Sequence, residues 1–234
     1  MGLLTDITKE VEEIFKTKWE TRDGTTIPEP EDVKLGNEAV KIEGTVLYAD
    51  LADSTQLVNN FKPWFAAEIY KAYLISACRI IRDNGGEITA FDGDRVMAVY
   101  TGNRKNTSAA TSALQINHIV LKVINPKLTA AYPNTNYTIR QAVGIDTGNL
   151  FIARTGIRGS NDLVWVGRAA NFAAKLCSLR EGYYTSYITK DVFSMLNESA
   201  KVFGDPKQNM WEECPWVEQN TTVYRSSWWL RPPD

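Results

Sequence analysis

The stretch YADLADST, residues 48–55, decides where the chemistry of this chain lies. Val46 and Leu47 lead into it as β-forming residues, so a strand is predicted to run up to Asp50. The segment from Asp53 to Gln56 has the composition of a helix start with a capping box. A carboxylate therefore lies where a predicted strand ends and a predicted helix begins.

A second stretch, ITAFDGDRVMAV, residues 88–99, predicts a hairpin that carries another acid. Two β-rich runs flank Asp92-Gly93, a pair that favours a type I′ turn because both turn residues must take positive φ. Asp94 follows directly. Acids at a hairpin tip and at a strand end can converge on a hard cation such as Mg²⁺. Taken singly, each acid is equally well explained as a turn residue or a helix cap, and Asp92 and Asp53 are interpreted in that way.

Taken together, these motifs resemble those of the class III nucleotidyl cyclases. That family places one metal Asp in a strand before a small turn containing Thr, and a second in a Gly-Asp hairpin, which correspond here to Asp50 and Asp94. GRAANFAAK, residues 167–175, is similar to the family's G-x-x-V-N-x-A-x-R helix, and GIDTG, residues 144–148, resembles its G-[IV]-[HD]-[ST]-G strand. Asn171 fits the helix motif, whereas Lys175 replaces the family's Arg.

Composition bounds the class of protein. With 234 residues, 44% of them apolar, the chain is expected to form one domain with extensions. We see no apolar run long enough for a membrane span and no signal peptide, so a soluble, cytoplasmic protein is expected. A net charge of −2 shows no general bias toward nucleic acid. The single histidine, His118, is predicted to lie on a solvated helix face, which argues against Ser/His or Cys/His catalysis.

The order of predicted elements favours an α+β fold with a mostly antiparallel sheet and packed helices, and the resemblance implies the ferredoxin-like cyclase fold. We expect an N-terminal helix and linker arm over residues 1–41 and the catalytic domain over residues 42–200. A Trp-rich extension packed on the domain is expected over residues 201–234. Within the domain, residues 137–146 and 149–154 are predicted to form a second hairpin around Thr147-Gly148.

The resemblance implies cyclisation of a nucleoside triphosphate by two Mg²⁺ or Mn²⁺ ions held by Asp50 and Asp94. Backbone N–H groups at the predicted helix start are expected to hold the phosphates, with help from the helix dipole. The residues that supply them are Ala52, Asp53, Ser54 and Thr55. Lys175 is expected to stabilise the transition state and Asn171 to orient the ribose. One such domain per chain implies a homodimer with its sites at the interface.

The family's adenine-selecting Lys and Asp are replaced here by Ala90 and Val164, which cannot hydrogen-bond a purine through their side chains. Tyr48 is predicted on the same strand face as Asp50, roughly 6 to 7 Å away, where its ring would favour a pyrimidine. Core packing is an equally open interpretation of Tyr48. The chain thus looks like the Pycsar pyrimidine cyclases of anti-phage defence, which make cyclic UMP or cyclic CMP for a separate effector.

Conversion of UTP to cyclic UMP is the favoured interpretation, and several others stay open. They are a cytidylate cyclase acting on CTP, an adenylate or guanylate cyclase with an unusual pocket, and a cyclase-like nucleotide-binding module without activity. A palm-type polymerase also carries paired acids on a hairpin, but the motif around Asn171 fits it poorly.

Overall fold

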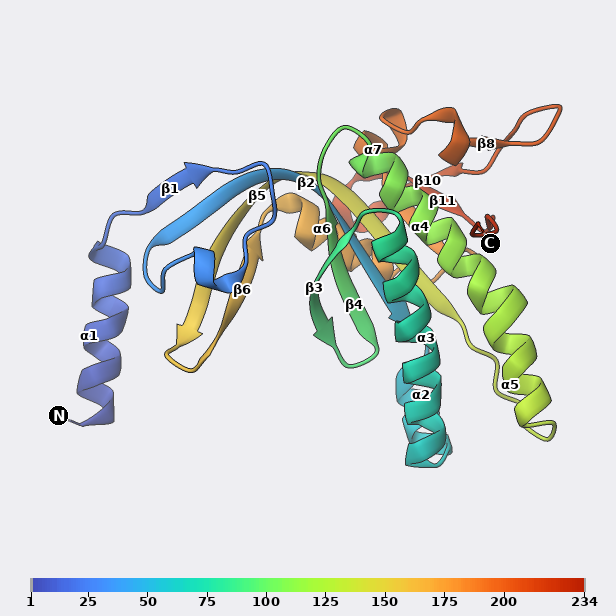
Figure 1. Ribbon diagram of the computed structural model, residues 1–234, viewed down its shortest axis with the longest axis horizontal. Coiled ribbons are helices and arrows are strands. Elements are labelled where there is room, and N and C mark those ends of the chain that lie inside the picture. Colours follow the sequence, from blue (N-terminus) through green and yellow to red (C-terminus); the bar gives the residue numbers. More distant parts are fainter. Residues whose placement is uncertain (1, 234) are drawn as a thin grey trace.

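In the computed structural model, which describes residues 2–233, nine strands form one sheet (Figure 1). The strand order is β10-β11-β7-β5-β2-β4-β3, with β1 paired to β2 and β6 paired to β5. Only the β1–β2 and β5–β7 pairs in this sheet are parallel among the described residues. The expected α+β fold with a mostly antiparallel sheet is therefore confirmed. The strands are β1 Glu20–Asp23, β2 Glu38–Leu51, β3 Glu87–Asp92, β4 Arg95–Tyr100, β5 Gln141–Ile157, β6 Ser160–Val166, β7 Ser186–Thr189, β10 Glu212–Trp216 and β11 Thr221–Ser226.

Helices cover both faces of this sheet. The α-helices are α1 Leu3–Lys16, α2 Ser54–Asn60, α3 Pro63–Asp83, α4 Lys105–Ile119, α5 Asn125–Ala131, α6 Arg168–Cys177 and α7 Lys190–Ser194. A π-helical segment, η2 (Val120–Ile124), joins α4 to α5. Short 3₁₀ turns are η1 Pro30–Asp32, η3 Glu198–Ala200 and η4 Val217–Gln219, and a small separate sheet consists of β8 Val202–Phe203 and β9 Gln208–Asn209. Within the described residues, no helix is both long and apolar enough to cross a membrane.

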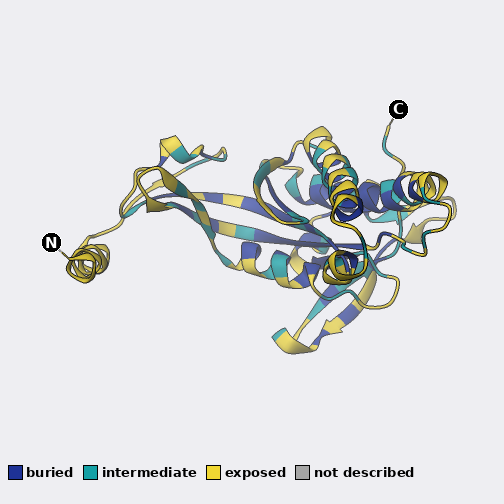
Figure 2. Cartoon of the chain, turned by 90° about the horizontal axis from the view of Figure 1, so that it is seen from below, coloured by how far each residue is buried: buried dark blue, intermediate teal, exposed yellow. Residues whose placement is uncertain are grey.

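Alternation along β2 separates two apolar clusters. Leu47 and Leu51 belong to the larger cluster, on the side of α3 and α4, whereas Val46 and Tyr48 belong to the cluster on the side of α6. Successive strand residues point to opposite faces, so Asp50 shares the α6 side with Tyr48. Figure 2 shows the dark blue core concentrated where helices cover the sheet, while α1 at the N-terminus has no buried residue.

The predicted second hairpin around Thr147-Gly148 is wrong, because β5 runs through this position as one strand. Its ladder with β2 continues from Ala39↔Ala153 to Leu51↔Gln141. The buried Thr147 hydroxyl lies 3.0 Å from the Thr45 hydroxyl and within hydrogen-bond distance of the Gly44 carbonyl, so the chain is tied to β2 where we expected a turn. The actual hairpin joins β5, which ends at Ile157, to β6, which begins at Ser160, through a two-residue turn.

Two terminal segments contribute more structure than the sequence suggested. In the expected helix and linker arm, residues 1–41, α1 is followed by β1, the turn η1 and the first residues of β2. In the segment 201–234, β10 pairs with β11, and β11 pairs with β7. Both strands therefore belong to the main sheet. His118 is half-buried with its ring centroid 4.9 Å from that of Trp229, so its expected solvated position is wrong.

The closest packing between α6 and the sheet occurs at Gly144 of β5. A Cβ atom at Gly144 would lie 2.2 Å from the Ala173 carbonyl oxygen and 2.3 Å from the Cys177 backbone nitrogen. Both neighbours are helix backbone, which cannot move aside as a flexible side chain can. The absence of a side chain on Gly144 therefore allows α6 to reach the sheet.

We expect Gly144→Ala to lower the free energy of unfolding by about 3 kcal/mol or more, because α6 must be displaced. Urea denaturation followed by circular dichroism measures this. The control is Gly2→Ala, where an added Cβ has no neighbour within 4 Å. Equal stability of the two variants would show that α6 can shift without cost.

Candidate active site

Asp50 and Asp94 are brought together by the pairing of β2 with β4. Asp50 lies opposite Arg95 in this ladder, and Asp94 is the residue before Arg95. The turn itself differs from the prediction: Asp92 pairs with Arg95, so the two turn residues are Gly93 and Asp94. Only Gly93 of these has positive φ, at 62°, as in a type II′ turn and not the predicted type I′. Asp94 is therefore part of the hairpin tip.

The two acids influence each other electrostatically. Burial raises the pKa of Asp50 above its usual value, and the nearby Asp94 carboxylate raises it further. Arg180 and Arg95 oppose this effect, Arg180 through an ion pair of 2.6 Å between its Nη2 and the Asp50 Oδ2. A cation bound between the two carboxylates would offset their mutual repulsion.

The residues present fit a divalent metal ion. Asp94 Oδ2 is buried and has no hydrogen-bond partner, although a buried carboxylate oxygen normally has one. Among residues 2–233 there is no group of three or more His, Cys, Asp or Glu side chains that could hold a metal. Mg²⁺ is commonly bound by one or two carboxylates together with substrate phosphates and water, which matches a two-acid site.

The start of α2 differs from the expected phosphate cradle. Asp53 takes the N-cap position with a left-handed φ of 60° and makes no side-chain cap bond, so the predicted capping box is absent. Its carboxylate instead lies 3.7 Å from Arg140 Nη1. The Ala52 N–H donates to the Arg140 carbonyl at 2.8 Å. The expectation that Ala52 offers its N–H to a phosphate is therefore wrong, which leaves Asp53, Ser54 and Thr55 as candidates.

Three of the strand residues near the acids form a row across the sheet. Tyr48 pairs with Met97 of β4, and Met97 pairs with Ala90 of β3, so these side chains share a face. Tyr48 is half-buried, and the Arg95 guanidinium lies 5.4 Å from the centroid of its ring. Ala90 is exposed. Tyr48 and Asp50 therefore share the face that the sequence predicted.

Asn171 and Lys175 project from the outer face of α6. They are exposed and four residues apart, so they are neighbours on one side of the helix. Its opposite side is buried against the sheet. The N-terminus of α6 is held to β5 by Asp146, which is 3.3 Å from Arg168 and accepts a 2.6 Å hydrogen bond from the Thr189 hydroxyl.

Val164 lies far from the acids of its own chain. It pairs with Ala153 near the far end of β5, whereas Asp50 pairs with Ala142. These positions are 11 residues apart on β5, or roughly 35 Å along the strand. Paired residues of neighbouring strands share a face, so Val164 lies on the face of Ala39. Ala39 and Asp50 are 11 residues apart in β2, and side chains alternate along a strand, so Val164 and Asp50 lie on opposite faces. A single chain therefore does not bring Val164 to its own Asp50.

Arg180 is the site residue that sequence reasoning missed. It follows α6 by three residues, has a left-handed φ of 44°, and reaches Asp50 across 130 sequence positions. No motif marks it, because its contact with Asp50 depends on how the segment after α6 packs beside β2.

The sequence of this chain is similar to those of several known proteins. No protein-family model matches the chain. It is 49% identical to a uridylate cyclase from Xanthomonas perforans over 97% of this chain and 98% of the relative. A uridylate cyclase from Rhodovulum sp. is 42% identical over 99% of both chains.

Solved structures share the architecture at low sequence identity. The adenylyl cyclase CyaB from P. aeruginosa matches with a TM-score of 0.68 and 18% identity, over 81% of this chain and 95% of that one. The guanylyl cyclase Cya2 matches with a TM-score of 0.65 and 17% identity, over 83% of this chain and 96% of that one. These similarities establish the fold.

We expect the stability of the protein relative to Asp146→Asn to fall as pH rises. Burial raises the pKa of Asp146 above its usual 3.8, so the folded state disfavours the charged form. The favourable contribution of the protonated acid is complete below the unfolded-state pKa and is lost as pH rises through the higher folded-state pKa. The unfolding temperatures of the parent and of Asp146→Asn, measured at a series of pH values from below 3.8 upward, give the difference in stability. A difference in stability between the parent and Asp146→Asn that stays constant with pH would contradict the assignment.

Proposed function

This chain belongs to the class III nucleotide cyclases, among relatives named uridylate cyclase, and we propose that it converts UTP into cyclic UMP and pyrophosphate. The observation that carries the proposed chemistry is the pair Asp50 and Asp94 on adjacent strands, one of them with a buried, unpartnered oxygen. In the reaction the 3′-oxygen bonds to the α-phosphorus, the bond from that phosphorus to the leaving oxygen breaks, and the hydroxyl proton passes to solvent.

Asp50 and Asp94 are our candidates for holding two Mg²⁺ or Mn²⁺ ions. When bound, such ions would lower the pKa of the attacking hydroxyl and neutralise charge on the leaving pyrophosphate. Arg180 forms an ion pair with Asp50 in this structure. When a cation binds to Asp50, the guanidinium of Arg180 has to move away or contact the same carboxylate together with the cation. Such an exchange keeps the acid paired in both states, because an unpaired charge in a partly buried site is costly.

The chain's own groups would position the triphosphate. The N–H groups of Asp53, Ser54 and Thr55 lie beside the metal acids, at the end of β2, and suit phosphate oxygens. Lys175 would place a positive charge on the α-phosphate. A lysine offers a point charge without the bidentate geometry of arginine. Asn171 would orient the ribose through its amide.

We propose that the site is completed by a second copy of the chain. Asn171, Lys175 and Val164 lie on other elements than the acids, and Val164 is roughly 35 Å of strand away. A two-fold dimer would bring one chain's acids to the other chain's α6 and β6.

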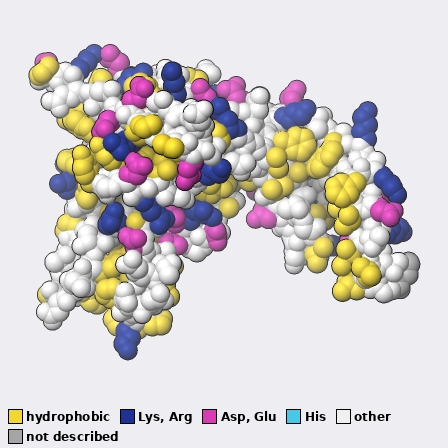
Figure 3. Space-filling view, turned by 180° about the vertical axis from the view of Figure 1, so that it is seen from behind, with side chains coloured by type: hydrophobic (Ala, Val, Ile, Leu, Met, Phe, Trp, Pro, Cys, Tyr) yellow, Lys and Arg dark blue, Asp and Glu magenta, His cyan; other side chains and the backbone are white. Residues whose placement is uncertain are grey.

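Exposed apolar side chains on the projecting arm support this dimer. Figure 3 shows yellow side chains gathered on the arm that carries α1, β1 and β6. The large apolar residues exposed there include Leu3, Leu4, Ile7, Val11, Ile14, Phe15, Trp19, Ile157, Val164 and Val166. Apolar surface of this extent is typical of an interaction site.

The base assignment rests on Tyr48, Ala90 and Val164. Ala90 and Val164 offer a purine no side-chain hydrogen bond, and the half-buried Tyr48 ring occupies space on the face of Asp50. A pyrimidine fits better beside this ring than a purine does, and CTP is the nearest competing substrate. We further propose that the cyclic nucleotide serves as a second messenger in anti-phage defence and activates a separate effector.

We expect the purified protein, incubated with each of the four nucleoside triphosphates and Mg²⁺ or Mn²⁺, to make cyclic UMP as its main product. Liquid chromatography with mass spectrometry identifies the product. Asp50→Asn and Asp94→Asn should each reduce the rate by at least about 100-fold, because a metal-held charge is lost. The control Asp205→Asn, an exposed change in the turn between β8 and β9, should retain the parent rate. Cyclic CMP or a cyclic purine nucleotide as main product would refute the UTP assignment, and full activity of either acid variant would refute the metal assignment.

We expect Asp94→Asn and Lys175→Ala, each inactive alone, to restore activity when the two variants are co-expressed. Random pairing makes half of the dimers mixed, each with one intact site of two, so about a quarter of the parent activity should return. Tandem purification with two different tags isolates the mixed dimer, which has one intact site of two and should show about half of the parent activity. Activity no greater than the sum of the separate variants would mean that each site lies within one chain.

A further inference from the structure

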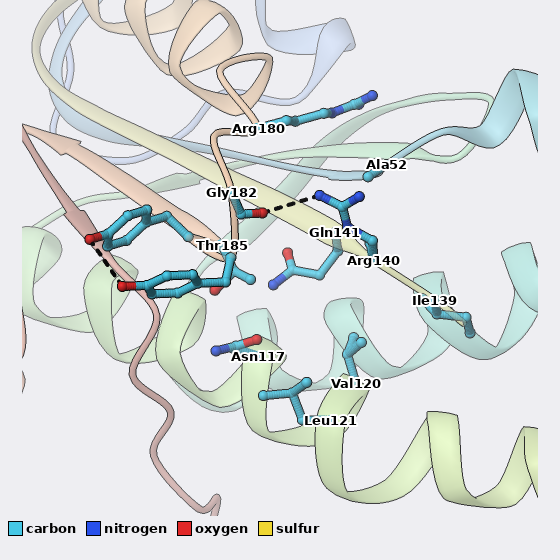
Figure 4. Close-up of a pocket in the computed structure, with 12 residues that line it drawn as sticks. Ala52, Asn117, Val120, Leu121, Ile139, Arg140, Gln141, Arg180, Gly182 and Thr185 are labelled. Atoms are coloured by element: carbon cyan, nitrogen blue, oxygen red, sulfur yellow. Dashed lines mark hydrogen bonds between the residues drawn. The ribbon is translucent and has the colours of Figure 1, made fainter. Parts of the chain in front are cut away.

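A cavity lies on the other face of the sheet, behind the strand end that carries Asp50. It has a volume of about 240 Å³ and is enclosed by the start of β5, the end of α4 with η2, and the loop 180–185 (Figure 4). Gln141 lines it and pairs with Leu51 in the ladder, which puts its side chain on the α4 side of the sheet. This cavity is therefore separate from the face of Tyr48 and Asp50.

Unpartnered polar groups are concentrated in this cavity. Gln141 is only 4% exposed, yet neither its Oε1 nor its Nε2 has a hydrogen-bond partner. The Oδ1 of Asn117, a residue 1% exposed, and the buried Thr185 hydroxyl also lack partners. Figure 4 shows these three side chains pointing into one shared space. Leaving such groups unmet costs roughly 1–3 kcal/mol each, so the cavity is built to satisfy them with something it holds.

The positions of these groups are set by the surrounding structure. Asn117 Nδ2 donates to the Ser227 and Trp228 carbonyls at 3.1 and 2.9 Å, which leaves its Oδ1 directed away from the tail. Val120 and Leu121, in the π-helical segment, and Ile139 supply an apolar wall. Short π-helical segments are rare and frequent at functional sites. An apolar wall with a few converging polar groups is typical of a small-molecule site.

The charges around the cavity favour a neutral ligand. Arg180 at its edge is paired with Asp50 at 2.6 Å, and Arg140 donates to the Gly182 carbonyl at 3.2 Å and lies near Asp53. The interior groups are amides and a hydroxyl. Gln141 offers a donor beside an acceptor, Asn117 adds an acceptor, and Thr185 adds a donor or acceptor.

We propose that this cavity binds a small, neutral, planar molecule with a cyclic amide or imide edge, such as a free pyrimidine base. Its N–H and C=O groups would pair with the Gln141 amide, a second N–H would reach Asn117 Oδ1, and its flat face would lie on Val120 and Ile139. A volume of about 240 Å³ is well above the roughly 30 Å³ of a water molecule and below that of typical drug-sized sites.

A ligand in the cavity would alter the surroundings of Asp50. Ala52, two residues after Asp50, and Arg180, which holds the Asp50 carboxylate, both line the cavity. Arg180 Nε is itself buried without a partner. A ligand that engages this nitrogen would bias which way the guanidinium turns, so the site is suited to regulation of the proposed reaction.

Binding of uracil to the full chain, measured by isothermal titration calorimetry without metal or nucleoside triphosphate, tests the proposal. We expect saturable binding of one uracil per chain, weakened at least about tenfold in Gln141→Leu and Thr185→Val. The probe 1,3-dimethyluracil, which lacks both N–H donors, should bind at least about tenfold more weakly than uracil. Because these measurements need no turnover, they are independent of whether the proposed reaction is correct.

Controls separate the cavity from the metal face and from misfolding. Gln208→Leu, an exposed change on β9, and Tyr48→Ala should both bind uracil as the parent does. Gln141→Leu should unfold at the parent's temperature or above it, since it removes unpaired buried groups. Absence of saturable binding by the folded parent would mean that the cavity holds only water, and loss of binding in Tyr48→Ala with retention in Gln141→Leu would place uracil on the metal face. Either result would overturn the proposal.

Discussion

Backbone pairing between β2 and β5 is the constraint on which the other contacts depend. The ladder from Ala39↔Ala153 to Leu51↔Gln141 sets which side chains face α6 and which face α3 and α4. It presents Gly144 opposite Tyr48, and the missing side chain there lets α6 approach. The end of the same ladder carries Asp50 on one face and Gln141 on the other. A shift of one residue in this pairing would exchange those faces, because strand side chains alternate.

Opposing effects act on Asp50, and those that raise its pKa prevail. Burial and the proximity of Asp94 make the charged form of Asp50 unfavourable, while Arg180 and Arg95 make it favourable. Arg180 arrives from the loop after α6, so helix packing at Gly144 and charge balance at Asp50 are coupled. A site that holds two like charges is expected to be less stable than one without them, and a bound cation would offset that cost.

Two regions with different side chains thus lie back to back across one strand end, and the one on the α4 side is a cavity. On the α6 side are carboxylates, a guanidinium and a tyrosine ring, which suit cations and phosphates. On the α4 side are amides, a hydroxyl and aliphatic carbons, which suit a neutral planar molecule. Arg180 touches both regions, since its guanidinium pairs with Asp50 while the residue lines the cavity. A side chain that contacts both regions is a direct physical means of linking their occupancies.

The sequence alone determined the α+β class, the placement of Asp50 at a strand end, and the shared face of Tyr48 and Asp50. These features follow from local composition and strand alternation, which act over a few residues. Tertiary structure decided that β5 continues through Thr147, because the hydroxyl contact with Thr45 and the long ladder outweigh a local turn signal. It also decided that the Ala52 N–H donates to the Arg140 carbonyl and that Arg180 pairs with Asp50. The side-chain amide of Gln141 lacks a hydrogen-bond partner for the same reason. Each of these depends on groups far apart in the chain, whose meeting no local pattern encodes.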